Sequence, residues 1–213
     1  MVNAALLVVT DVDSTLIQDE VIELLADAAG TRDQVASVTE RAMRGEIDFA
    51  ESLRERVATL AGLSDDIFAT VVERVRVSPG AQQLIDAVHE RGGIVGAVSG
   101  GFRQVLDPLA VHLGLDLWEA NVLEVVDGHL TGQVLGDIVD GQRKADLLVH
   151  WASRNEVPLT HTMAVGDGAN DLRMMAQAAV SVGYHPKPIV AEHADHVISV
   201  GGLDQAVAWL PAV

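Results

Sequence analysis

The sequence predicts an α/β protein whose core is a doubly wound, Rossmann-like parallel sheet, with an inserted helical cap and one β-hairpin. Three short apolar runs lack polar alternation, which is typical of strands buried on both faces of a parallel sheet. Each run ends in a cluster rich in glycine or aspartate, and helix-like stretches separate the runs. The predicted strands cover residues 4–9, 94–98 and 163–165.

The helices of the core follow in chain order. A helix is expected over residues 81–91, where Gly92 and Gly93 would end it. A second is expected to begin near Phe102, and a third covers residues 144–154. Because open parallel sheets bind ligands at the carboxyl ends of their strands, the polar clusters that follow the three strands should meet in one cleft.

Two segments depart from this alternation. Residues 17–75 have helical character almost throughout, with single glycines between the helices and no strand-like run, so we expect an inserted cap. In NVLEVVDGHLTGQVL, the pair Asp127-Gly128 between β-prone flanks predicts a hairpin. The expected division is a core of residues 1–15 and 77–213 and a cap of residues 16–76.

Composition restricts the function. Of the 213 residues, 49% are hydrophobic and 21% charged, as in ordinary globular proteins. A net charge of -17 repels polyanions, so neither nucleic acid nor an anionic membrane is an expected partner. Cysteine is absent, which excludes disulfides and a cysteine nucleophile. No apolar run approaches the roughly 20 residues of a membrane span, and no signal peptide is recognisable, so we expect a cytoplasmic protein.

Two aspartate clusters follow predicted strands. DVDST supplies Asp11 and Asp13, whose side chains would diverge in extended backbone unless a turn at the following serine and threonine brings both into the cleft. GDGAND supplies Asp167 and Asp171. Either cluster alone is also compatible with turn and helix-capping carboxylates. An EF-hand calcium loop is excluded because Leu16 stands at the position of the required glycine and Ile22 at that of the bidentate glutamate.

Four carboxylates in one cleft require compensation. Two like charges about 4 Å apart repel by about 4 kcal/mol at an effective dielectric near 20, so the cluster implies raised pKa values or a bound cation. With oxygen ligands only, a hard ion such as Mg²⁺ is the natural choice.

Two further residues could bind an anion. Ser99, in AVSGG, follows a predicted strand and precedes a predicted helix, whose first N–H groups favour an anion. Lys144 lies near the start of another helix and could supply a positive charge, although a lone lysine is more often a solvated surface residue.

Together these motifs carry a resemblance. DVDST, Ser99-Gly100, Lys144 and GDGAND, in this order, look like the four motifs of the haloacid dehalogenase superfamily. Within it the chain most resembles the phosphoserine phosphatases, because EVIELLADAAG and RAMRGEIDFAESLRERV are similar to segments characteristic of that family. The resemblance runs over nearly the whole chain.

The resemblance implies a mechanism and a set of roles. Asp11 would be the nucleophile and Asp13 the general acid and base, in the hydrolysis of O-phospho-L-serine through an aspartyl-phosphate. The resemblance further implies that Mg²⁺ is held by Asp11, by Asp167 and by the backbone carbonyl of Asp13. It implies that Ser99, Gly100 and Lys144 hold the phosphoryl oxygens, and that Asn170 and Asp171 complete the shell. In the cap it points to Glu20 and Arg56 as the partners of the substrate ammonium and carboxylate, with Met43 and Phe49 as apolar cover.

Several alternatives stay open at this level. A related phosphotransferase would pass phosphate to homoserine, and another capped phosphatase would take a different small phosphomonoester. A serine hydrolase is disfavoured because Ala97 occupies the first glycine position of a nucleophile elbow. A non-catalytic phosphate-binding module would be expected to lack the nucleophile, whereas every motif carboxylate is present. The expected partner is a small molecule in L-serine biosynthesis, and a homodimer is compatible with the sequence.

Overall fold

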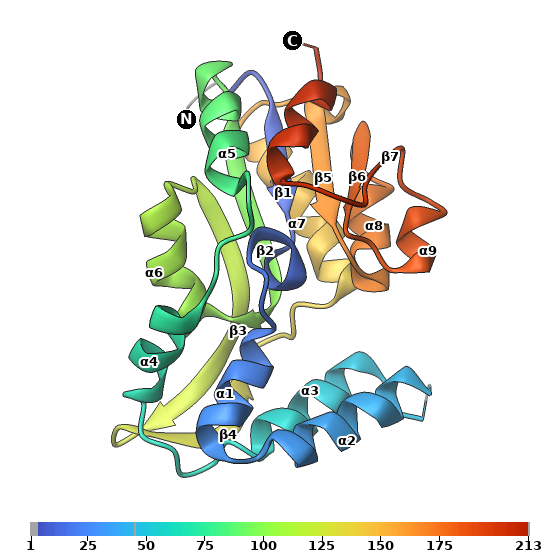
Figure 1. Ribbon diagram of the computed structural model, residues 1–213. Coiled ribbons are helices and arrows are strands. Elements are labelled where there is room, and N and C mark those ends of the chain that lie inside the picture. The colour runs from blue at the N-terminus through green and yellow to red at the C-terminus, as the bar shows by residue number, and fades with distance from the viewer. Residues whose placement is uncertain (1–3, 45, 213) are drawn as a thin grey trace.

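The central feature of the computed structural model is a seven-stranded sheet in the order β4-β3-β2-β1-β5-β6-β7 (Figure 1). The structure describes residues 4–44 and 46–212. Every neighbouring pair of strands is parallel except β3 and β4, which are antiparallel. The strands are β1 (Leu7–Thr10), β2 (Ile94–Phe102), β3 (Leu117–Val126), β4 (His129–Leu135), β5 (Thr162–Gly166), β6 (Val180–Tyr184) and β7 (His196–Ile198). The predicted fold class is confirmed.

Strand β1 lies between β2 and β5. Leu7 pairs with Ile94 on one side and with Thr162 on the other, so the three strands run in register toward the same edge. The segments that follow their carboxyl ends are therefore brought together, as the sequence predicts. Strand β2 continues four residues beyond its predicted end, to Phe102, because pairing with β3 resumes after a register shift.

Helices cover both faces of the sheet (Figure 1). One face packs against α5 (Ala81–Glu90) and α6 (Arg103–Leu113), and the other against α7 (Gly141–Arg154), α8 (Leu172–Met175) and α9 (Pro188–Ala191). Alternate residues of the first strand serve the two faces: Val8 joins one apolar cluster, while Leu7 and Val9 join the other. Each fully buried Val or Leu contributes about 1.5–3 kcal/mol, so the strand that leads to Asp11 is held firmly from both sides.

The cap is helical, as predicted. It consists of α1 (Val21–Ala29), α2 (Arg32–Met43), α3 (Phe49–Ala58) and α4 (Ile67–Arg74). The two segments that join it to the core lie side by side, because Ile17 and Val77 form an antiparallel bridge and the N–H of Gln18 donates to the carbonyl of Arg76 over 2.9 Å. The boundaries of the cap stay a prediction.

The hairpin is confirmed and has a second role. Asp127 and Gly128 both adopt positive φ, 50° and 75°, as a type I′ turn requires. The hairpin also pairs with the cap: the N–H of Gly62 donates to Leu130 O over 2.8 Å, and the N–H of Leu130 donates to Leu63 O over 2.8 Å. The cap is thus attached to the core at a third place.

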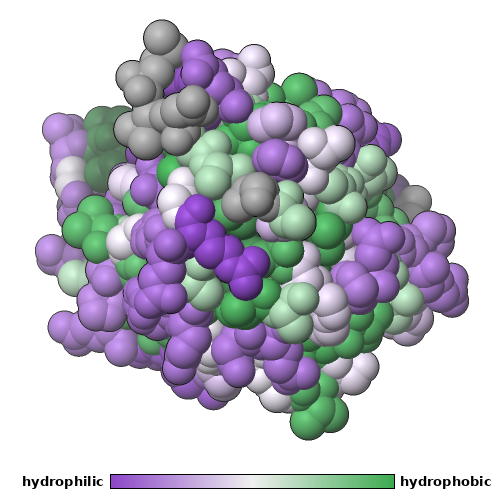
Figure 2. Space-filling model, turned by 90° about the horizontal axis from the view of Figure 1, so that it is seen from above, coloured by the Kyte–Doolittle hydropathy of each residue, from purple (hydrophilic) through white to green (hydrophobic). Residues whose placement is uncertain are grey.

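The described helices include none that is both long and apolar enough to cross a membrane. At the end of the molecule opposite α2 and α3, hydrophobic residues lie interspersed among hydrophilic ones (Figure 2).

Candidate active site

The turn after β1 determines where the first two aspartates lie. The backbone winds tightly over Val12–Leu16, and Ser14 adopts a positive φ of 58°. This turn keeps Asp11 at the strand end and redirects Asp13, so both line one cavity instead of diverging. The expected turn at the serine is therefore observed.

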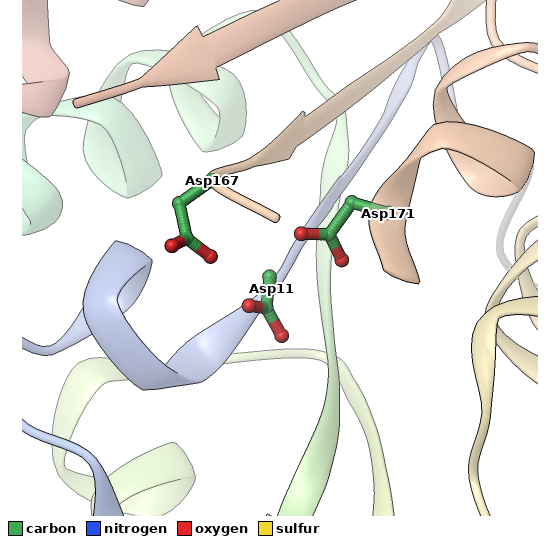
Figure 3. Close-up of side chains that lie close together, drawn as sticks. All are labelled: Asp11, Asp167 and Asp171. Atoms are coloured by element: carbon green, nitrogen blue, oxygen red, sulfur yellow. The ribbon is translucent and has the colours of Figure 1, made fainter. Parts of the chain in front are cut away.

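Three carboxylates converge at this edge of the sheet. Asp11, Asp167 and Asp171 are buried, and each offers an oxygen within 4.8 Å of the others (Figure 3). Burial raises the pKa of Asp11 well above its ordinary value, and the neighbouring charge of Asp171 adds to the effect. Burial likewise raises the pKa of Asp167. An all-oxygen, electron-rich cluster of this kind fits a hard divalent cation.

Lys144 is the buried counter-charge to this cluster. Its side chain projects from α7, is fully buried, and donates hydrogen bonds to Asp11 Oδ1 and, over 2.8 Å, to Asp171 Oδ1. Burial alone would lower the pKa of Lys144, but the two carboxylates raise it above its ordinary value, so the ammonium stays charged. The surface-residue alternative for Lys144 is wrong. The helix begins at Gly141, earlier than predicted, because Asp140 caps it by accepting from the N–H of Arg143 over 2.8 Å.

Asp13 faces a different set of partners. One oxygen accepts from the N–H of Val21 at the start of α1 over 2.8 Å, and the other accepts from Ser99 Oγ over 2.7 Å. Burial raises the pKa of Asp13, although these hydrogen bonds oppose the shift. Ser99 Oγ also accepts from the N–H of Gly101 over 2.7 Å, so within the described residues its two hydrogen bonds go to an aspartate and a backbone amide. A serine hydrolase with a Ser-His-Asp triad would need a histidine there.

A cavity of about 620 Å³ lies between this edge of the sheet and the cap. Its lining includes eight of the predicted residues: Asp11, Asp13, Glu20, Phe49, Arg56, Gly100, Asp167 and Asn170. Ser99, Lys144 and Asp171 lie directly behind this surface, in contact with the carboxylates described above. Met43 is the last residue of α2, and its predicted role falls on a side chain outside the described part of the structure.

The cap supplies a carboxyl group, a guanidinium group and an aromatic ring to the cavity. Glu20 accepts a hydrogen bond from Ser14 Oγ over 2.7 Å, and burial together with the charge of Asp13 raises its pKa to about 7. Arg56 donates from Nε to the carbonyl of Ser52 over 3.2 Å. Phe49 lies against Gly100, where a Cβ would come within 2.9 Å of the ring. The predicted cap residues that are described thus lie opposite the aspartates.

Two cationic residues that line the cavity were not predicted, Arg173 and Lys187, and of these two only Lys187 forms an ion pair with one of the three converging carboxylates. Lys187 lines the cavity, and its Nζ lies 3.2 Å from Asp167 Oδ2. Burial would lower its pKa, but the charge of Asp167 raises it. Lys187 follows β6, the parallel neighbour of β5, so the rule that located the other clusters would also have located this loop had β6 been recognised.

Comparison with known proteins agrees with this geometry. A family model described as haloacid dehalogenase-like hydrolase matches residues 8–176. The chain belongs to the haloacid dehalogenase-like hydrolases. The predicted family is confirmed, and the matched region contains all three carboxylates and Lys144.

Within this family, several similar proteins are phosphoserine phosphatases. The chain is 49% identical to the phosphoserine phosphatase of Streptococcus thermophilus over 97% of this chain and 96% of that protein. It is 54% identical to the phosphoserine phosphatase of Streptomyces coelicolor over 98% of its own length, but it spans about half, 51%, of that relative. A solved structure titled as a phospho-aspartyl intermediate analogue of phosphoserine phosphatase superposes with a TM-score of 0.90 at 36% identity, covering 97% of this chain and 99% of the other.

Proposed function

We propose that this hydrolase is a magnesium-dependent phosphoserine phosphatase that converts O-phospho-L-serine and water to L-serine and phosphate in the cytoplasm, in L-serine biosynthesis. The observation that carries the proposal is the pairing of two halves in one cavity: a buried Asp11 held by Lys144 below, and Glu20 with Arg56 above. The similarity to the phosphoserine phosphatase of Streptococcus thermophilus, which extends over nearly all of both chains, supports it.

The carboxylate cluster would hold the metal. Asp11, Asp167 and the backbone carbonyl of Asp13 are the proposed ligands of Mg²⁺, and Asp171 would complete the surrounding shell. The raised pKa values of Asp11 and Asp167 support this assignment, because a cation would relieve the repulsion that burial intensifies. When bound, Mg²⁺ neutralises negative charge on the phosphoryl group and the carboxylates.

Asp11 and Asp13 would divide the chemistry between them. The carboxylate of Asp11 attacks phosphorus, and the bond between phosphorus and the serine oxygen breaks while Asp13 gives its proton to that oxygen. The product of this step is an aspartyl-phosphate and free serine. Asp13, now ionised, takes a proton from the water that attacks phosphorus, which releases phosphate and restores both aspartates. The raised pKa of Asp13 supports a protonated starting state.

Other core groups would hold the phosphoryl oxygens. Lys144 brings a positive charge that two carboxylates fix in place, and Ser99 and Gly100 lie at the end of the neighbouring strand. Asn170 lines the same side of the cavity. The fixed charge of Lys144 needs no reorganisation as charge develops in the transition state.

The cap would choose the substrate. Arg56 suits the substrate carboxylate because a guanidinium can donate two parallel hydrogen bonds, and Glu20 suits the ammonium. Because the pKa of Glu20 is about 7, an approaching ammonium would favour its ionised form. Phe49, against Gly100, would shield the intermediate from bulk water, with Met43 proposed to share that role.

The proposal is tested by phosphate release from O-phospho-L-serine, phosphothreonine, a phosphosugar and p-nitrophenyl phosphate, with Mg²⁺ and with excess chelator. We expect chelator-sensitive release that strongly favours O-phospho-L-serine. Homoserine added in parallel distinguishes hydrolysis from transfer, because a phosphotransferase would form phosphohomoserine at the expense of free phosphate. Metal-dependent release that favours another ester would contradict the assignment of the cap, and no release from any ester would contradict the enzyme hypothesis.

A further inference from the structure

Asn121 is a buried polar residue that the reaction described above does not use. It lies on β3, is 1% exposed, and pairs with Phe102 at the place where the register of β2 and β3 shifts. Its Nδ2 donates to the carbonyl of Gly100 over 2.9 Å, and its Oδ1 accepts from the N–H of Val139 over 2.8 Å. One side chain thus joins three segments: β3, the end of β2 and the loop before α7.

These hydrogen bonds continue to Asp13. The peptide between Gly100 and Gly101 is held at both ends, since its carbonyl accepts from Asn121 and its N–H donates to Ser99 Oγ over 2.7 Å. A hydroxyl has a single hydrogen, and that of Ser99 is directed to Asp13 Oδ2, 2.7 Å away. The peptide is also close to the carboxylate, because a Cβ on Gly101 would lie 2.7 Å from Asp13 Oδ2.

We propose that Asn121 is a positioning residue for the phosphatase reaction: it holds the Gly100–Gly101 peptide and thereby fixes Ser99 and the carboxyl group of Asp13. This inference rests on the proposed role of Asp13 as the general acid. Linked hydrogen bonds in a buried site polarise and constrain one another, so loosening the first bond loosens the last. The second bond of Asn121 reaches Val139, next to the capping residue Asp140 of the helix that carries Lys144.

The leaving group distinguishes this role from a purely structural one. Serine leaves as an alkoxide unless Asp13 protonates it, whereas p-nitrophenolate is a stable anion that needs little protonation. The ratio kcat/KM covers only the steps up to departure of the leaving group, so it excludes the later attack of water. A displaced Asp13 should therefore lower kcat/KM for O-phosphoserine far more than for p-nitrophenyl phosphate.

The test variant is Asn121→Asp, which retains an acceptor for Val139 and, in its ionised form, has no donor for Gly100. We expect kcat/KM to fall by about 30-fold for O-phosphoserine and by no more than about 3-fold for p-nitrophenyl phosphate, a partial loss of general acid catalysis. The matched control is Asn155→Asp. Asn155 is half-buried at the end of α7, its Nδ2 donates to Trp151 O over 2.8 Å, and it does not line the cavity, so both substrates should keep their wild-type kcat/KM.

Equal losses on the two esters, or no loss on either, in a folded Asn121→Asp protein would overturn the proposal. If circular dichroism shows that this variant is unfolded, Asn121→Leu, which has a similar size and no charge, enters the same comparison with the same expectation. Unfolding of both variants would assign Asn121 to the fold and not to the reaction. A wild-type protein that hydrolyses p-nitrophenyl phosphate but not O-phosphoserine would contradict the proposed substrate instead, and the comparison would then use an alkyl phosphate that the wild type does hydrolyse.

Discussion

The floor of the cavity and its roof differ in how firmly their side chains are held. On the floor, built by the core, Asp13 and Lys144 each make two side-chain hydrogen bonds; Lys144 is fully buried and Asp13 is half-buried. On the roof, built by the cap, Arg56 donates to a carbonyl of its own helix, and Phe49 is 37% exposed. Preorganisation is therefore concentrated where charge would develop, and the groups proposed to choose the substrate remain free to adjust.

The largest effect is expected on the floor. Asp11→Asn removes the proposed nucleophile, and turnover of O-phosphoserine should fall by at least about 10⁴-fold. The fold should persist, because the substitution also removes one charge from a repulsive buried cluster. Steady-state kinetics and a thermal melt check both statements. Substantial activity in this variant would exclude the proposed mechanism.

Lys144→Met should show how much the floor depends on its counter-charge. Removing one partner of a buried ion pair leaves uncompensated carboxylates, so the free energy of unfolding without metal should fall by about 3 kcal/mol. Mg²⁺ should restore part of this loss. The matched control is Lys187→Met: its pair with Asp167 is partly exposed, and its loss should cost less than about 1 kcal/mol. Denaturant melts with and without Mg²⁺ measure both, and equal losses would refute the distinction.

On the roof, Arg56→Ala should change recognition more than chemistry. The KM for O-phosphoserine should rise by about 30-fold, the loss expected for a charged hydrogen bond, while the KM for p-nitrophenyl phosphate, which lacks a carboxylate, changes little. Arg54→Ala is the matched control, because Arg54 lies on the same helix and is exposed. Similar rises of KM on both esters would show that Arg56 does not bind the substrate carboxylate.

The smallest effect is expected at Glu20. Its pKa is raised from 4.5 to about 7 in the folded protein, so its ionisation destabilises the fold progressively as the pH rises from 4.5 to about 7, and the loss is constant above that. Glu20→Gln removes this penalty. Without metal, the variant should be more stable than the wild type at pH 8 and show no gain at about pH 4.5. Urea melts at the two pH values test this, and a gain that is independent of pH would contradict the raised pKa.

The core could be predicted well because its signals are local. Runs such as residues 163–165 are apolar throughout, and each is followed by the cluster that reaches the site. Lys187 was missed because the strand before it, VSVGY, alternates hydrophobic with small residues, unlike the continuous apolar runs of the other core strands, and was not recognised. The role of Asn121 could not be predicted either. It depends on the register shift between β2 and β3, which is set by pairing between residues far apart in the sequence. The burial of Lys144 depended in the same way on two carboxylates far away in the sequence.

The hairpin holds one end of α3, so a small tilt of this helix moves its other end. Gly132 of β4 packs so closely against Ala58 that a Cβ there would lie 3.3 Å from the carbonyl oxygen of Ala58, which fixes the C-terminal end of the helix. Phe49 is at the other end, about 13 Å away at 1.5 Å per residue. Over that length, a rotation of about 10° displaces the far end by about 2 Å, enough to lift the ring from Gly100. A small tilt of α3, together with the α2 helix that packs against it, would thus change access to the cavity.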